Sequence, residues 1–394
     1  MLPVPSQVEH AAPAALHESA RMAWVDNLRT FVIVLVVNMH ACVTYSHVGD
    51  WYVMEAPEPP MTVKMGFLFW QGHLQAFFMG LLFFLSGVFA HKSLERRGAR
   101  WFLQERAVRL CMPALLYMLL IHPIILFVIL GRNGAVLLWR NYLNYLMSGR
   151  FFSGNGPLWF ALALFAFSMA LVLSRWTPGR SPKHSQNSLA PTAAKLVLFG
   201  FGLVLGTFLV RLFQPIGTSI LNFQLCFFVQ YIAAFVAGIA AAKHGWLEQL
   251  AISRRAKIAG WLGAVLGPVC LLSVLQLGGE PPEHGPNPYA GGWRPQAFDL
   301  AFWEQLTGVA LGLGMLALFR RHFNLSGPFA QWLNQRSFAV YVLHAPVLVM
   351  LTLWLRPIPG TSLSRMLVLT LLGLLTSYLA AGLAKRVPGL RSIL

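Results

Sequence analysis

The amino-acid sequence predicts an all-α fold: a polytopic membrane bundle of about ten transmembrane helices, with both termini in the cytoplasm. Of the 394 residues, 57% are hydrophobic and 11% are charged, and the mean hydropathy is +0.60. A soluble protein carries about 25% charged residues. The apolar segments follow one another too closely for separate soluble domains, and basic residues gather in alternate loops, as in multi-pass membrane proteins.

Ten segments are long and apolar enough to cross a bilayer, and an even number of crossings puts both termini on one side. We expect one integral membrane domain, 24–386, between a disordered tail at 1–23 and a short tail at 387–394. The stretch 131–156 also has the basic and aromatic anchors of a short interfacial helix. The expected spans are 28–45, 66–90, 110–130, 157–175, 195–213, 224–242, 258–277, 299–319, 337–355 and 363–383.

The formal net charge of +17 has two readings. In a soluble chain it would indicate binding to nucleic acid. Here the Lys and Arg residues lie mainly in the loops 91–109, 176–194 and 243–257 and at the chain end, and the intervening loops are poor in them. This bias predicts that these loops and both termini are cytoplasmic. No basic stripe with interleaved aromatics stands outside the spans, so we expect membrane lipids as surroundings and no nucleic-acid partner.

The first candidate site lies in the first span, at Asp26, Arg29 and His40. Asp26 and Arg29 are three residues apart and can pair on a helix. Eleven residues at about 100° each put Arg29 and His40 on one face, with a rise of roughly 16 Å. If Arg29 marks the membrane surface, His40 lies near the midplane, where an ionisable group is costly without a role. The alternative is a snorkelling Arg with a capping Asp, and a His bonded inside the bundle.

Arg106 and Arg109 form a second candidate site at the cytoplasmic edge of the third span. They are three residues apart and share a helical face. Two guanidinium groups at that spacing suit bidentate contacts with phosphates. Plain positive-inside anchoring, or contact with anionic lipid head groups, explains the same pair.

Three further polar residues fall inside spans. Glu304, His344 and His73 should face a cavity or a partner and not lipid, so each is a candidate for substrate binding or for a structural hydrogen bond. The histidines at 40, 73, 122 and 344 belong to different segments, and the chain has no HExxH motif and no paired cysteines. We therefore expect no metal.

Five sequence motifs resemble those of the acyltransferase-3 family of integral membrane acyltransferases. They follow in family order along nearly the whole chain. The opening motif, and CVTYSHVGDWY after its His, resemble the subgroup of glucan-modifying succinyltransferases. The motifs are WVDNLRTFVIVLVVNMH at 24–40, FFLSG at 83–87, RAVRL at 106–110, GPLWF at 156–160 and SFAVYVLHAPVLV at 337–349.

The resemblance implies an acyl-CoA-dependent enzyme of the bacterial inner membrane. Such an enzyme moves an acetyl or succinyl group from cytoplasmic acyl-CoA to a hydroxyl of a cell-envelope glycan or lipid-linked sugar, as in O-acetylation, glucan biosynthesis and polysaccharide modification. His40 then matches the essential histidine of the family, Arg29 its paired arginine and Asp26 the preceding acid. Arg106 and Arg109 match the pair proposed to hold the nucleotide end of CoA.

The physics of a multi-pass bundle with polar residues inside also suits a transporter or flippase of acylated or glycosidic envelope material. A histidine combined with a cytoplasmic arginine pair suits a CoA thioester better, because neutral imidazole can activate a hydroxyl or accept an acyl group. Whether transfer is direct or passes through an acyl-enzyme stays open.

Overall fold

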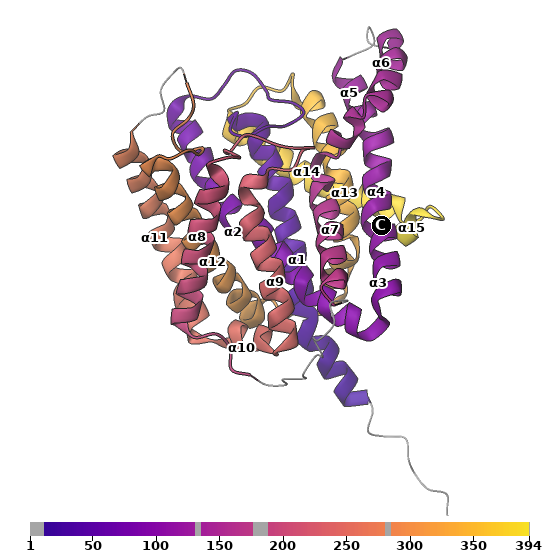
Figure 1. Cartoon of the computed structure of the whole chain (residues 1–394). Coiled ribbons are helices and arrows are strands. Elements are labelled where there is room, and N and C mark those ends of the chain that lie inside the picture. The colour runs from indigo at the N-terminus through magenta and orange to yellow at the C-terminus, as the bar shows by residue number, and fades with distance from the viewer. Residues whose placement is uncertain (1–11, 131–134, 176–187, 280–284, 394) are drawn as a thin grey trace, which may run out of the picture.

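A computed structural model describes residues 12–130, 135–175, 188–279 and 285–393. Over these residues the secondary structure is helical, and ten helices or helical runs are long and apolar enough to span a membrane. The predicted all-α fold and its ten spans are confirmed. Figure 1 shows the long helices standing side by side in one bundle.

Nine of the spans centre on one long helix each. Helix α1 starts within the segment expected to be a tail, and its apolar part begins at Ala23. These helices are α1 (Ala12–Ser46), α2 (Met61–Arg97), α7 (Trp159–Leu173), α8 (Ala193–Arg211), α9 (Phe228–Lys243), α11 (Arg254–Gly278), α12 (Pro295–His322), α13 (Pro328–Leu355) and α14 (Ser362–Ala384).

The third span is a continuous run with two π-helical turns. Pro113 and Pro123 lack the N–H that an α-helix needs for its i−4 hydrogen bond, and π turns accompany such interruptions. The run contains α3 (Ala99–Arg106), the π turn η1 (Ala107–Cys111), α4 (Met112–Leu116), the π turn η2 (Tyr117–Ile121) and α5 (His122–Leu130).

Short helices connect or flank the spans. The helix allowed by the sequence within 131–156 is present as α6, which Figure 1 shows beside α5 at one end of the bundle. The short elements are α6 (Ala135–Met147), the 3-10 turns η4 (Arg150–Ser153), η5 (Gly156–Leu158) and η6 (Leu225–Phe227), and the helices α10 (Trp246–Ile252) and α15 (Leu390–Ile393).

Helix α1 is central, packing against α2, α12, α13 and α14, while α2 packs closely along α9 and α11 along α12. Glycines permit the close contact between α2 and α9. A Cβ atom on Gly87 would overlap the carbonyl of Phe235, and one on Gly238 would overlap that of Phe84. Close backbone approach through small residues is a common way for helices to associate in membranes, where the hydrophobic effect offers little.

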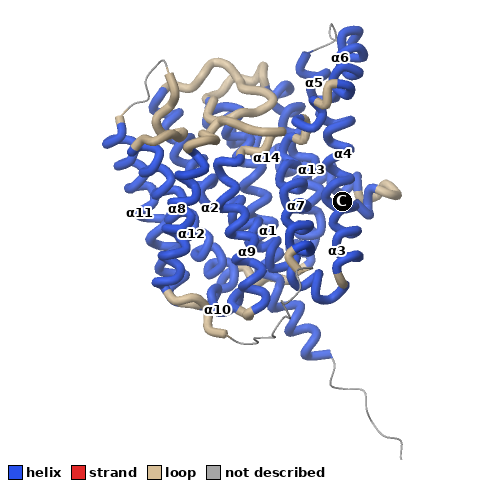
Figure 2. Tube along the Cα trace, viewed as in Figure 1, coloured by secondary structure: helices blue, strands red, loops and turns tan. Residues whose placement is uncertain are grey.

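The loops gather at the two ends of the bundle (Figure 2). We call the end with the loop 47–60 and α6 the distal end; it is uppermost in Figures 1 and 2. The opposite end, with α10, is the proximal end. Each candidate residue can be assigned to one of these ends or to the helices between them.

Candidate active site

Helix α1 carries three of the residues singled out in the sequence. Near its proximal part, Arg29 Nη2 lies 3.1 Å from Asp26 Oδ1, so the expected ion pair is present, and the two side chains are 38% and 41% exposed. The guanidinium carbon of Arg29 lies 5.9 Å from the centre of the Phe89 ring. Arg29 is therefore oriented by its neighbours yet stays open to an anion.

His40 lies nearer the distal end than its spacing from Arg29 suggested. The span runs from Ala23 to Ser46, so six residues, or about 9 Å of helix, separate His40 from the distal end. The midplane estimate took Arg29 as the surface, whereas the apolar helix continues to Ala23. His40 is thus on the distal side of the middle of the span.

His40 forms a hydrogen-bonded pair with His344 of α13. The Nδ1 of His40 lies 3.1 Å from the Nε2 of His344, and the Nδ1 of His344 lies 2.7 Å from the carbonyl oxygen of Tyr341. His344 is fully buried. The structure therefore brings together two candidates that the sequence placed 304 positions apart.

The pair has a defined arrangement of protons when both rings are neutral. A carbonyl oxygen only accepts, so Nδ1 of His344 must donate to Tyr341 and its Nε2 must then accept. The Nδ1–H of His40 is the donor to that Nε2. The Nε2 of His40 is then left with its lone pair. A nitrogen in this state is ready to take a proton.

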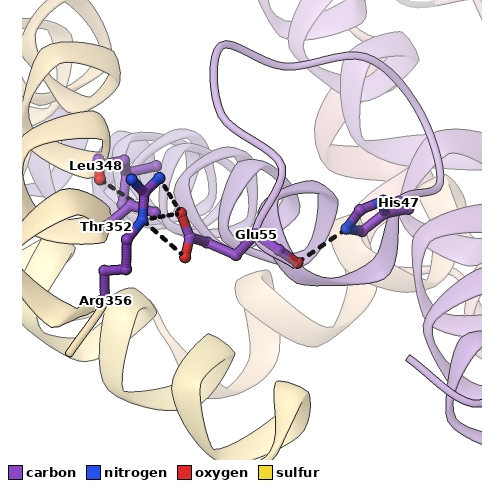
Figure 3. A network of polar contacts seen from close by, with 5 residues as sticks. All are labelled: His47, Glu55, Leu348, Thr352 and Arg356. Atoms are coloured by element: carbon purple, nitrogen blue, oxygen red, sulfur yellow. Dashed lines mark hydrogen bonds and ion pairs between the residues drawn. The ribbon is translucent and has the colours of Figure 1, made fainter. Parts of the chain in front are cut away.

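The loop 47–60 covers His40 from the distal side. The ring of Trp51 stacks on that of His40, with 4.0 Å between centroids. The loop is tied down at several points: Glu55 N–H donates to the Thr44 carbonyl over 2.9 Å, and His47 Nε2–H donates to the Glu55 carbonyl over 2.9 Å. Figure 3 shows His47 and Glu55 in this network.

The strongest tie of this loop is the ion pair of Glu55 with Arg356, at the end of α13 (Figure 3). Two guanidinium nitrogens of Arg356, Nη2 at 2.6 Å and Nε at 3.0 Å, donate to Glu55 Oε1. The Glu55 side chain is 4% exposed. Hydrogen bonding to this carboxylate raises the pKa of Arg356. Since α13 also carries His344, one helix positions both the partner of His40 and the loop that covers it.

Arg106 and Arg109 lie in the third span, toward the proximal end. Arg109 forms an ion pair with Glu105 over 3.4 Å, and its side chain is 64% exposed. Arg106 packs its guanidinium over the ring of Phe102 at 5.2 Å and has no ion pair among the described residues. No hydrogen bond or ion pair within the described part of the chain joins either arginine to Arg29 or His40.

More cations gather around Arg109. Burial, and then the positive charges of Arg336, Arg109 and Arg391, lower the pKa of Lys385, just past the end of α14. The short helix α15 packs against η1, which contains Arg109. These residues (Arg109, Arg336, Lys385 and Arg391) form a basic cluster at the proximal side, and Arg106 lies one turn away.

Glu304 of α12 pairs with Arg211, at the end of α8. Arg211 Nη2 lies 2.6 Å from Glu304 Oε2, and the two side chains are 0% and 6% exposed. The Nε and Nη1 atoms of Arg211 and the Oε1 of Glu304 have no partner among the described residues. The sequence left a substrate-binding role and a structural pair open for Glu304, and the contact seen is a buried ion pair.

His73 of α2 lies away from the His40–His344 pair. Its Nδ1 lies 2.6 Å from the Phe69 carbonyl oxygen, and its ring meets the Trp303 ring edge-on at 5.1 Å. The Nε2 of His73 is buried and without a partner among the described residues. The structure therefore groups His73 with residues of α12, not with the contacts of His40.

Sequence reasoning did not single out Trp51, Glu55, Arg356 or Arg211. Trp51 and Glu55 lie in the loop directly after the helix of His40, and an acidic residue among aromatics next to a candidate catalytic helix was an available signal. Arg356 and Arg211 stand at helix ends, where a basic residue is ordinarily read as an interfacial anchor. Their partners are set by tertiary packing.

No group of three or more His, Cys, Asp or Glu side chains within the described ranges is arranged to hold a metal ion. A comparison with protein-family models matches residues 22–382 to the model described as an acyltransferase domain. The comparisons found no matching curated protein and no matching solved structure.

Proposed function

Since the chain belongs to the acyltransferase 3 family and is thus a membrane acyltransferase, we propose that it transfers an acetyl or succinyl group from cytoplasmic acyl-CoA to a hydroxyl of a cell-envelope glycan. We place it in the bacterial inner membrane with both termini in the cytoplasm, so that the distal end faces outward. The basic proximal residues support this orientation. The transporter alternative is set aside because the family is one of enzymes.

The donor enters from the proximal side. Arg106, Arg109 and the cations around Lys385 offer a site for the phosphates of CoA, because guanidinium groups bind phosphate oxygens in bidentate fashion. The pantetheine arm then runs along α1 toward the distal end. Arg29, about 16 Å along the helix from His40, is placed to contact the pyrophosphate, and Asp26 orients it.

His40 acts as the general base. Its Nε2 takes the proton of the acceptor hydroxyl as the oxygen attacks the thioester carbonyl. The C–S bond then breaks, and the leaving CoA thiolate takes that proton from the His40 imidazolium, which restores the neutral base. His344 is a positioning residue, since it accepts the Nδ1–H of His40 and stabilises the imidazolium that forms. The lone pair left on Nε2 by this hydrogen-bonded chain is the observation that carries the proposal.

Replacement of the base tests this mechanism. In purified protein supplied with labelled acetyl-CoA or succinyl-CoA and envelope glycan, His40→Ala should lower kcat by about 10²- to 10⁴-fold, the range typical of general-base catalysis. His322→Ala, which changes an exposed histidine at the proximal end of α12, is the matched control. Undiminished transfer by folded His40→Ala protein would refute the mechanism.

A further inference from the structure

A pocket of about 910 Å³ opens at the distal end, between the third span, α6 and η4. Its volume is in the range of small-molecule sites, roughly 300–1,000 Å³. Its polar lining includes His122, Asn141, Asn144, Tyr145 and Ser148, and one cation, Arg150. None of the described residues that line it is Asp or Glu.

The lining is suited to hydroxyl groups. A primary amide both donates and accepts hydrogen bonds, as a sugar hydroxyl does, and Asn141 and Asn144 therefore match either role. Both residues are exposed, and their side-chain amides have no hydrogen-bond partner among the described residues. Ser148 adds a hydroxyl just past the end of α6, four residues after Asn144. With the guanidinium of Arg150 as a further donor, this set of donors and acceptors favours a polyhydroxylated ligand.

A chain of aromatic contacts joins the pocket to His40. His122 Nδ1 lies 2.9 Å from the Tyr52 hydroxyl, and the two rings are 5.6 Å apart. Tyr52 meets Trp51 at 5.2 Å, and Trp51 stacks on His40 at 4.0 Å. Tyr52 and Trp51 therefore connect His122, in the lining of the pocket, to the proposed base. Both the pocket and His40 lie toward the distal end.

The geometry points to an acceptor site. We propose that this pocket binds an oligosaccharide segment of the acceptor glycan, some units away from the hydroxyl that receives the acyl group. The inference rests on the proposed function, which makes the acceptor a glycan. A separate binding segment holds a long acceptor in place while another of its hydroxyls reaches His40, so a polymer is a better substrate than a single sugar.

Binding measurements without acyl-CoA test the pocket. The probes are glucose and neutral gluco-oligosaccharides of increasing length, titrated into the full-length protein in detergent. The double variant Asn141→Ala/Asn144→Ala should weaken binding of the longer oligosaccharides by about ten-fold, as expected for the loss of hydrogen bonds from two amides. Both changed residues are exposed, so folding is preserved. Acyl-CoA hydrolysis in the absence of acceptor should stay at the wild-type rate.

Gln276→Ala is the matched control, because Gln276 is an exposed amide near the distal end of α11, outside the pocket. It should bind every probe as the wild type does. Two results would refute the proposed acceptor site: equal binding of long oligosaccharides by the double variant and the wild type, or binding by the wild type that does not depend on oligosaccharide length. If the wild type transfers no acyl group but the double variant loses oligosaccharide binding, the proposed function is refuted, whereas oligosaccharide binding by the pocket is supported.

Discussion

At the scale of single residues, the central feature is the direction of the hydrogen bonds through two imidazoles. His40 and His344 were each singled out from the sequence, but their contact was not predicted, because helical spacing relates residues only within one helix. The Tyr341 carbonyl fixes the tautomer of His344, which in turn fixes that of His40. A backbone group three residues away on α13 thus decides which nitrogen of His40 is free to take a proton.

The first prediction concerns this positioning role. His344→Ala removes the acceptor for the His40 Nδ1–H, so His40 loses its orientation and kcat should fall by about 10- to 100-fold, as when a hydrogen-bond partner that orients a metal-binding histidine is removed. His344→Gln keeps a side-chain acceptor and should recover part of this loss. The KM for acyl-CoA should be unchanged in both. Steady-state kinetics decide, and a full kcat in His344→Ala would contradict the role.

At the scale of elements, the spans were predictable and the loops were not. Hydropathy marks each span because lipid demands apolar side chains and internally bonded backbone. The two π turns and the fold of the loop 47–60 depend on interactions that leave no periodic signal. Glu55, for instance, reaches Arg356 across 301 positions. The site residues on helices could therefore be proposed from the sequence, while the loop that completes the site could not.

The second prediction is that this ion pair holds the loop over His40. Arg356→Ala leaves the nearly buried Glu55 carboxylate unpaired, so the loop should open more often and kcat should fall by about ten-fold, since cover by a loop commonly sets turnover. Hydrogen exchange of 47–60 should rise. Arg294→Ala, an exposed arginine at the same end, is the control. Unchanged exchange in Arg356→Ala would show that Trp51 is held in place without the pair.

At the scale of the whole molecule, the proposed donor and acceptor sites lie at opposite ends of one bundle. The cations around Lys385 are proximal, the pocket beside α6 is distal, and α1 runs between them through Arg29 and His40. No direct contact among the described residues links the arginine pair to His40, and in the proposed function the extended acyl-CoA molecule bridges the two. The distribution of Lys and Arg among alternate loops of the sequence predicted that the basic residues gather at one end of the bundle.

The third prediction is the orientation of the bundle in the membrane. Cys270 is exposed and Cys111 is partly exposed, so Cys111→Ser/Cys270→Ser provides the background, and the buried Cys42 and Cys226 should not react. In that background Gln276→Cys, at the distal end, should be labelled from outside by a thiol reagent that cannot cross the membrane holding the protein. His322→Cys, at the proximal end, should be labelled only after that membrane is broken. The reverse labelling pattern would show that the distal end faces the cytoplasm and the basic cluster faces outward. That result would contradict the proposed binding of cytoplasmic acyl-CoA at the cluster.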